Sequence, residues 1–324
     1  MTDPAPPDPT DPSTTDPRDP CTPDPTDPRT PPPADAGVAA WVAEHGLPGL
    51  VDVHVHLLPP PIMARVRAHF AAAGPLIGRE WPIRYQWDEA DLVTHLRGLG
   101  VRWFSALPYA HRPGVSAYLN DWAGDLADRT PDCLRSATFF PEPGIGADVA
   151  RRLEDGVQLF KTHVQVGGFD PRDPLLDPVW AQLEESGRPV VVHAGSGPVP
   201  TRFTGPAPVA QVLRRFPALT MVIAHLGAPG HEEFVTLAET YERVHFDTTM
   251  VFTDFFERLR PFPRTLLPRV AALGDRVLLG TDYPNIPYPY AHQLGVLDRL
   301  GLGSDWLRAV CWDNAVRLLG LPTG

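Results

Sequence analysis

Five side chains that could bind a metal ion or transfer a proton follow short apolar segments of the sequence: His54, His56, His193, His225 and Asp282. Imidazole nitrogens and a carboxylate oxygen are donors that suit Zn²⁺ and other first-row divalent ions. His54 and His56 are two positions apart, so both side chains point to one face if their segment is a strand. A donor set of this kind that leaves one coordination position open is typical of a catalytic metal site.

Each of these signals has a plainer interpretation when it is taken alone. A His-x-His pair is weak evidence by itself, and a single histidine that ends a buried strand is more often a hydrogen-bonded core residue. An aspartate that follows a threonine, as Asp282 follows Thr281, often caps a helix. The combination favours a metal site, because all of these residues occupy the same end of their segments.

The segments that carry these residues have the composition of buried strands. Eight runs rich in Val, Ile and Leu are expected to be strands: Leu50–His56, Val101–Leu107, Leu134–Phe139, Val157–His163, Pro189–His193, Leu219–His225, Val244–Asp247 and Arg276–Asp282. Strands that are apolar on both faces belong in a parallel sheet covered by helices. Their alternation with helices indicates either a closed barrel or a doubly wound open sheet.

A closed barrel is the better prediction, because no Gly-x-Gly-x-x-Gly sequence follows a strand, as a dinucleotide-binding open sheet would require. We therefore predict the α/β class and a (β/α)8 TIM barrel. In that fold the C-terminal ends of the strands meet at one mouth, where active sites lie. The metal site is expected at those strand ends.

Amphipathic segments between the strands are expected to be helices: Asp88–Leu99, Val115–Arg129, Asp177–Ser186, Ala207–Phe216, His231–Tyr241, Phe262–Leu273, Ala291–Leu300 and Ser304–Leu319. Asp88 and Asp177-Pro178 are typical residues at helix starts. Gly187, Gly274 and Gly301 follow helices at positions that favour a left-handed backbone conformation.

The N-terminal segment has a different composition from the rest of the chain. Residues 1–35 repeat Asp-Pro and Thr-Pro, and they carry eight Asp against two Arg, which is −6 of the net charge of −11. So few apolar side chains cannot offset the entropy lost on ordering. We expect a disordered tail at 1–35 and a barrel domain at 36–324.

Charge and hydropathy limit the partners that we expect. No cluster of Lys and Arg suggests a track for nucleic acid. No apolar run approaches the roughly 20 residues that span a bilayer, and the N-terminus lacks the pattern of a secretory signal. We expect a soluble cytoplasmic protein whose partner is a small-molecule substrate, without nucleic acid or membrane partners.

The order His54-x-His56, His193, His225 and Asp282 resembles the amidohydrolase superfamily. The most similar branch is the amidohydrolase-related group (amidohydrolase 2) that includes aminocarboxymuconate-semialdehyde decarboxylase and resorcylate-type decarboxylases. The segment Trp312–Gly320 also resembles the final helix of that group, and the resemblance covers roughly residues 48–320.

This resemblance implies roles for the residues that match it. His54, His56, His193 and Asp282 would hold one divalent metal, with zinc expected first and manganese or iron as alternatives. His225 would act on the water or hydroxide at the metal, and Asp282 would both bind the metal and carry a proton. Members of the branch are often dimers, so a homodimer is a further expectation.

The fourth predicted strand leaves more than one interpretation open. Lys161 and His163 share a face there. Some superfamily members use a carboxylated lysine at this position to bridge two metals. We expect instead that Lys161 or His163 orients a substrate anion or a residue behind the metal ligands, and a buried, paired lysine is the third interpretation. Arg202, in the loop after the fifth strand, is also assigned to substrate binding.

The segment Leu57–Trp87 is long and contains arginines and aromatic residues, so it is expected to be a lid over the mouth. Asp247 and His231 are expected behind the site. The predicted function is a metal-dependent hydrolase that attacks a small carboxylated or cyclic organic substrate with a metal-activated water. Its alternatives are a metal-dependent non-oxidative decarboxylase (carboxy-lyase) and a catalytically silent barrel that binds a metal or metabolite.

Overall fold

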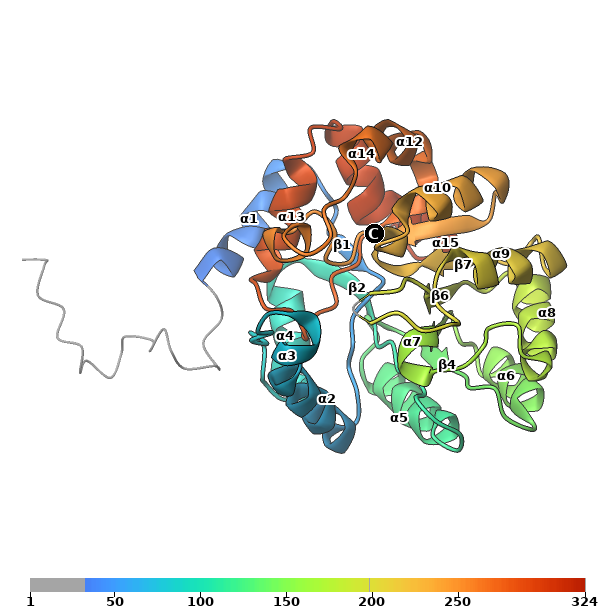
Figure 1. Cartoon of the computed structure of the whole chain (residues 1–324). Helices are drawn as coiled ribbons and strands as arrows, with labels where there is room; N and C mark the ends of the chain where they lie inside the picture. The colour runs from blue at the N-terminus through green and yellow to red at the C-terminus, as the bar shows by residue number, and fades with distance from the viewer. Residues whose placement is uncertain (1–32, 198, 324) are drawn as a thin grey trace, which may run out of the picture.

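The computed structural model describes residues 33–197 and 199–323, and it has strands at the centre with helices around them (Figure 1). The expected tail at 1–35 therefore lies almost wholly outside the described residues. None of the described helices is both long and apolar enough to cross a bilayer.

The strands of the described chain are short and parallel. They are β1 (Leu50–Asp52), β2 (Val101–Ser105), β3 (Cys133–Leu134), β4 (Ser136–Thr138), β5 (Leu159–His163), β6 (Val190–His193), β7 (Met221–Ile223), β8 (Val244–Asp247) and β9 (Val277–Leu278). They pair in chain order as β1-β2-β3 and β4-β5-β6-β7-β8-β9. β3 and β4 are the two halves of the single strand predicted at Leu134–Phe139, separated by Arg135.

Backbone hydrogen bonds between the segments that follow β1 and β9 connect the two ends of this series. Val53 N donates to Leu279 O at 3.0 Å, and Asp282 N donates to His54 O at 2.9 Å. These bonds place the first and last strands side by side, as a barrel requires. The predicted (β/α)8 TIM barrel is confirmed.

The helices occur mostly where the sequence predicts them. They are α1 (Val38–Glu44), α2 (Pro60–Ala72), α3 (Gly74–Ile77), α4 (Glu89–Gly98), α5 (Ser116–Arg129), α6 (Ile145–Glu154), α7 (Val164–Gly167), α8 (Asp177–Ser186), α9 (Pro206–Arg215), α10 (His231–Thr240), α11 (Asp254–Glu257), α12 (Leu267–Ala272), α13 (Tyr290–Asp298), α14 (Ser304–Arg308) and α15 (Asn314–Leu319). Asp88 caps α4 by accepting a hydrogen bond from Asp91 N, and Gly187 ends α8 with a φ of 67°.

Two predicted helices differ from the structure. The helix expected at Phe262–Leu273 is confined to the short turn η4 (Arg264–Leu266) and α12. Pro263 disfavours helical backbone at Phe262, and Pro268 has no N–H to donate to Arg264 O. The helix expected at Ser304–Leu319 is interrupted by a π-helical segment, Ala309–Asp313, between α14 and α15.

Alternate residues of each strand face two different apolar layers. Leu159, Val191 and Val222 belong to a cluster inside the barrel, together with Trp312 from the C-terminal segment. Val190 and Val192 instead face the helices and join the larger outer core. The interior cluster fills the barrel, so a ligand site has to lie beyond the strand ends.

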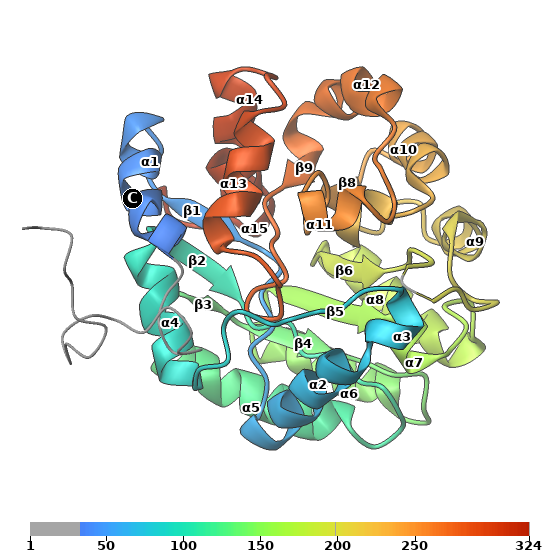
Figure 2. The same ribbon diagram turned by 60° about the vertical axis from the view of Figure 1, so that its left-hand side comes forward.

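The domain begins before residue 36. The turn η1 (Pro33–Gly37) lies beside α13, as Figures 1 and 2 show. Asp35 is only 4% exposed. Its carboxylate accepts hydrogen bonds from Tyr85 Oη at 2.5 Å and Ala291 N at 2.9 Å, and lies 3.1 Å from His95 Nε2. The expected boundary between tail and barrel therefore falls inside an ordered turn.

Replacing Asp35 by alanine should lower the free energy of unfolding by about 2 to 4 kcal/mol, because it leaves buried donors without an acceptor. Denaturant titration measures this change. Asp125→Ala is the matched control, since Asp125 is an exposed residue of α5. Equal unfolding midpoints for the two variants would contradict a structural role for Asp35.

Stability should also fall in mild acid through His245 in β8. Its Nδ1 is buried without a hydrogen-bond partner among the described residues, and burial and the charge of Arg276 lower its pKa to about 4. The unfolded chain takes up the proton near pH 6.5, so the stabilisation present above pH 6.5 is lost as the pH falls toward 4. In thermal unfolding at pH 7.5 and 5.0, His245→Leu should lose less stability than wild type, by about 1 kcal/mol. If His245→Leu and wild type lose equal stability between the two pH values, protonation of His245 is not the cause of the loss.

Candidate metal centre

The predicted site residues gather at the C-terminal ends of the strands, but most of them lie just past the strands themselves. His54 and His56 follow β1, and Asp282 follows β9. His225 lies in the turn η3 (Ala224–Gly227) with a φ of 57°, and Asp282 has a φ of 70°. Such left-handed conformations are uncommon for residues other than glycine and are found where function constrains the backbone.

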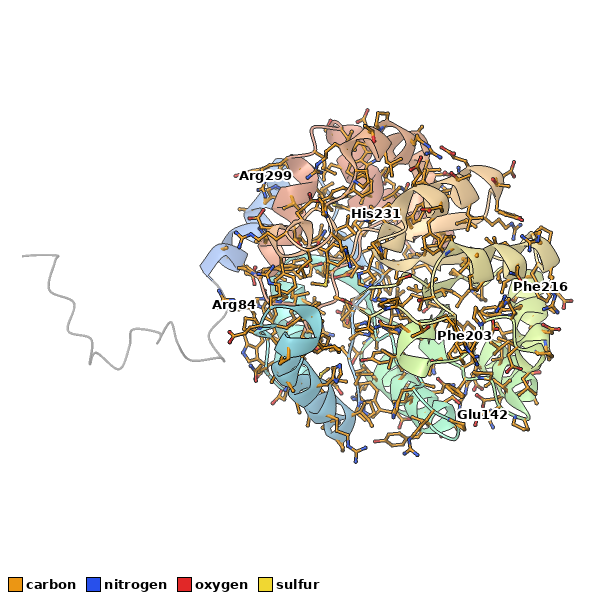
Figure 3. All side chains as sticks on the ribbon, in the orientation of Figure 1. Arg84, Glu142, Phe203, Phe216, His231 and Arg299 are labelled. Carbon is orange, nitrogen blue, oxygen red and sulfur yellow. The ribbon has the colours of Figure 1, made fainter. Side chains whose placement is uncertain are left out.

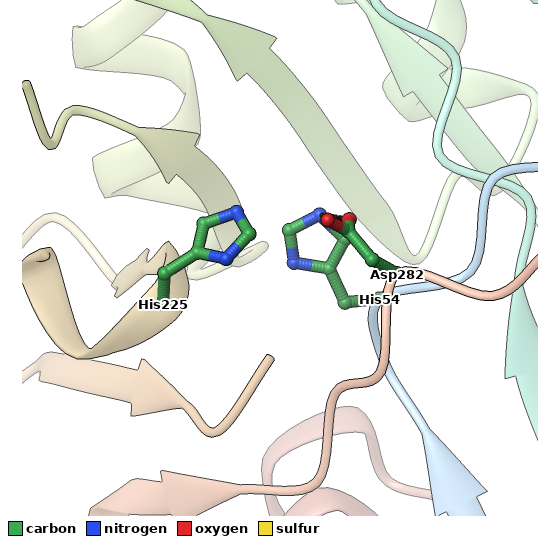
Figure 4. Close-up of side chains that lie close together, drawn as sticks. All are labelled: His54, His225 and Asp282. Atoms are coloured by element: carbon green, nitrogen blue, oxygen red, sulfur yellow. Dashed lines mark ion pairs between the residues drawn. The ribbon is translucent and has the colours of Figure 1, made fainter. Parts of the chain in front are cut away.

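Three donor atoms meet at the centre of this group. His54 Nε2 lies 3.2 Å from His56 Nε2, and each of these nitrogens lies 3.2 Å from Asp282 Oδ1. His225 points toward His54 and Asp282 from the opposite side (Figure 4). His54, His225 and Asp282 each offer one ligand atom within 4.8 Å of the others.

Hydrogen bonds on the far side of each ring determine what these nitrogens present to the centre. His54 Nδ1 lies 2.7 Å from Asp247 Oδ2, and His56 Nδ1 lies 2.9 Å from Leu107 O. Both oxygens accept, so each ring donates from Nδ1, and in a neutral imidazole Nε2 then carries a lone pair. Two nitrogen lone pairs and a carboxylate oxygen therefore face one another across 3.2 Å.

Such an arrangement is repulsive unless a cation lies among the donors. The rings are oriented as metal-binding histidines usually are, with the remote nitrogen bonded to a carboxylate or a backbone carbonyl. Nitrogen and carboxylate donors suit zinc, manganese or iron. The residues present therefore fit a divalent metal, and they do not select among these ions.

Asp247 holds both sides of the group. One of its oxygens accepts from His54 Nδ1, and the other accepts from the backbone nitrogens of His225, at 2.8 Å, and Thr249, at 3.1 Å. Burial raises the pKa of Asp247, but His54 and these hydrogen bonds outweigh it and hold the pKa well below its ordinary value. The carboxylate is fully buried, as expected for a residue behind the site.

Lys161 is the cation that the structure places against this group. Its Nζ lies 3.1 Å from His54 Nε2. Burial lowers the pKa of Lys161 to about 8, with Asp247 and Asp282 opposing the shift, so the ammonium is largely retained at neutral pH. Burial and the charge of Lys161 lower the pKa of His54 to about 4, so the His54 ring is neutral there. Lys161 therefore contacts one of the three facing donor atoms directly.

His193 lies beside the central group, with its ring centroid 4.7 Å from that of His225. Its Nε2 donates to Gly197 O at 3.1 Å, and its ring stacks on His163 with centroids 3.9 Å apart. His225, in contrast, donates from Nδ1 to Thr249 O at 3.1 Å, which leaves its Nε2 directed at the centre. The ligand role of His193 stays a prediction.

A cavity of about 820 Å³ opens above this group. The predicted lid forms one of its walls, since α2, α3 and Trp81 line it. His163 also lines the cavity, whereas Arg202 does not: its guanidinium lies 4.5 Å above the ring of Phe203, which Figure 3 labels. The structure thus does not bring Arg202 to the site.

Two cavity residues were not identified from the sequence. Tyr109 lies between His56 and His163, with ring centroids 5.2 and 5.4 Å away. Asn285 is buried, and its Oδ1 has no hydrogen-bond partner in the described structure. Each follows a predicted strand by two or three residues, which is the only signal that could have identified them.

Comparison with known proteins supports the same fold. The chain is similar to a TIM-barrel protein from Bordetella bronchiseptica at 21% identity, with a TM-score of 0.67 over 84% of this chain and 99% of that one. It is similar to 5-carboxyvanillate decarboxylase from Sphingomonas paucimobilis at 17% identity, with a TM-score of 0.60 over 85% of this chain and 100% of that one.

A third similar structure is a probable 2-pyrone-4,6-dicarboxylic acid hydrolase from Acinetobacter baumannii, at 14% identity, with a TM-score of 0.58 over 84% of this chain and 99% of that one. A search of curated proteins finds no match. The family model described as Amidohydrolase matches residues 51–321, which is most of the chain. With its barrel and its histidine and aspartate cluster, this chain belongs to the amidohydrolase family.

Proposed function

We propose that this protein is a metal-dependent hydrolase that acts on a small carboxylated or cyclic organic substrate. The observation that carries the proposal is the convergence of His54 Nε2, His56 Nε2 and Asp282 Oδ1 within 3.2 Å of one another. We assign His54, His56, His193 and Asp282 as ligands of one divalent metal. His193 donates from Nε2 to Gly197 O, so in a neutral ring its Nδ1 carries the lone pair that would bind the metal.

A divalent metal in this site would supply a Lewis acid and would lower the pKa of a water molecule toward neutrality. The protein residues would then accept and donate the protons of the reaction. His225 is fixed by its bond to Thr249 O, and its Nε2 accepts a proton from the attacking water. Asp282 faces the same centre and returns a proton to the leaving group.

Other cavity residues would position the substrate. Tyr109 keeps its proton over the whole range of neutral pH, because burial and the nearby charge of Asp282 raise its pKa. It can therefore donate a hydrogen bond to a substrate oxygen. Asn285 presents a buried amide to the same space. His163 contributes a ring face at the inner end, and Lys161, which does not line the cavity, would contribute positive charge from its position 3.1 Å from His54 Nε2.

Non-oxidative decarboxylation is a second candidate, favoured by the apolar walls of the cavity. The lid and the segment around α11 line the space above the histidines with apolar side chains such as Ile62, Phe70 and Phe255. In that reaction the carbon next to the carboxylate would be protonated by His225 or Asp282, and CO2 would leave. Two solved structures with this fold are 5-carboxyvanillate decarboxylases, from Sphingomonas paucimobilis and Novosphingobium aromaticivorans.

The reaction can be assigned by testing the metal-loaded protein on two groups of compounds. Lactones, esters and amides should be hydrolysed without release of CO2, as followed by proton release. Asp282→Asn should reduce the rate by about 10²- to 10⁴-fold, because it removes a proton carrier as well as a ligand. CO2 release from aromatic or enoic carboxylic acids would assign the carboxy-lyase instead. No turnover by fully metal-loaded protein would contradict an enzymatic role.

Asp247→Asn should weaken metal binding by about 10- to 100-fold. An asparagine side chain that accepts from the backbone at His225 turns its NH2 group toward His54 Nδ1. His54 would then have to place its proton on Nε2, where it blocks the metal. Competition with a chromogenic chelator measures the affinity, and circular dichroism checks the fold. Asp125→Asn, on the outside of α5, should bind metal as wild type does; equal weakening in both variants would refute the role of Asp247.

A further inference from the structure

The cavity above the histidines is much larger than a single-ring substrate requires. Its volume is about 820 Å³. A cavity of roughly 150 Å³ is enough to hold benzene. His56, His225 and Asp282 line the inner end of the cavity, and residues of the lid, α7 and α11 line its outer part.

The walls of this outer part are apolar and come from two segments. Ile62, Val66 and Phe70 line it from α2 in the lid. Phe255 and Phe256 line it from α11. Polar reacting groups alone would not need such walls, whereas an apolar substrate body gains affinity from each contact with them.

The two walls are fixed to each other across the cavity. Arg79 Nη1 donates to Phe255 O at 2.8 Å, and the guanidinium lies 3.8 Å above the Phe255 ring. Trp81 Nε1 donates to Asn285 O at 2.7 Å, and its ring lies 4.9 Å from the rings of both Phe70 and Phe255. The lid and α11 are therefore joined by hydrogen bonds and ring contacts around the outer cavity.

The rim of the cavity exposes large apolar side chains to solvent. Leu76 of the lid is 58% exposed, Val166 of α7 is 48% exposed and Leu259, after α11, is 36% exposed. All three line the cavity. Exposed apolar groups gathered at one opening mark a binding surface. Continuity with the histidine site indicates that the ligand of this surface is the one that enters the cavity.

Two arginines stand at the same opening. Arg65 of α2 and Arg260 both line the cavity and are exposed, and neither forms an ion pair within the described residues. The chain as a whole is acidic, with a net charge of −11. Positive charge at the mouth would attract an anion toward the site.

We infer that the substrate is an amphiphilic organic anion: its reacting polar end lies at the histidines, and an extended apolar body fills the outer cavity as far as Leu76, Val166 and Leu259. This inference rests on the proposed function for the position of the reacting end. It defines the class of substrate more narrowly than a small carboxylated ring.

Straight-chain alkanoates of four to ten carbons serve as unreactive probes, and calorimetry on the full, metal-loaded chain measures their binding. Because each methylene would move from water to an apolar wall, Kd should fall up to about fourfold per added carbon. An equal Kd for butanoate and decanoate would overturn the inference.

Variants of the rim and the wall show which residues make the alkanoate Kd depend on chain length. The double variant Leu76→Ser and Leu259→Ser should weaken decanoate binding by about tenfold and leave butanoate unchanged. Val66→Phe should shorten the longest chain that still gains affinity. Leu175→Ser is the matched control, because Leu175 is 41% exposed but does not line the cavity. Equal effects of rim and control variants would overturn the inference.

The rim could instead hold a second copy of the chain, and sedimentation velocity on the same samples tests this. A dimer that the rim variant dissociates, together with alkanoate affinities that do not vary with length, would refute the inference. Chain-length dependence concerns binding and not turnover. Length-dependent binding can therefore be observed even if the screen for hydrolysis and decarboxylation finds no reaction, which would contradict only the proposed function. A reaction together with length-independent binding would contradict only the amphiphilic substrate.

Discussion

The carboxylate of Asp247 is the interaction on which the site depends. It joins the ring of His54 to the backbone of His225, so the segments after β1 and β7 are held by the end of β8. The backbone beside it leaves no room for a side chain, because a Cβ at Gly280 would collide with Thr249 Oγ1 and lie 2.9 Å from Cβ of His54. A buried charge is stable here because its partners are all donors.

This arrangement explains how one fold can place reactive groups beside an apolar cavity. The hydrogen bonds of Asp247 lie below the cavity. The apolar cluster around Trp312 fills the barrel interior. The lid and α11 supply apolar surface above it and are connected by Arg79 and Trp81. The site and the substrate chamber are therefore built from different segments: strand ends set the chemistry, and the connecting segments set which molecule reaches it.

Apolar periodicity and chain order were enough to predict the barrel and the gathering of His54, His56, His225 and Asp282, because parallel strands bring their ends together. The same signals could not give the orientation of His193, which depends on a carbonyl of the following loop. Nor could they reveal that Asp35 is buried, since its partners Tyr85 and Ala291 lie 50 and 256 residues away.

The metal content of the purified and reconstituted protein tests the central claim most directly. Mass spectrometry should find about one equivalent of zinc, manganese or iron per chain, because the donor atoms of His54, His56 and Asp282 meet at one point. Two equivalents would assign Lys161 to a bridge between metals. No bound metal after reconstitution would contradict the account, since Lys161, 3.1 Å from His54 Nε2, would then be the cation that faces these donors.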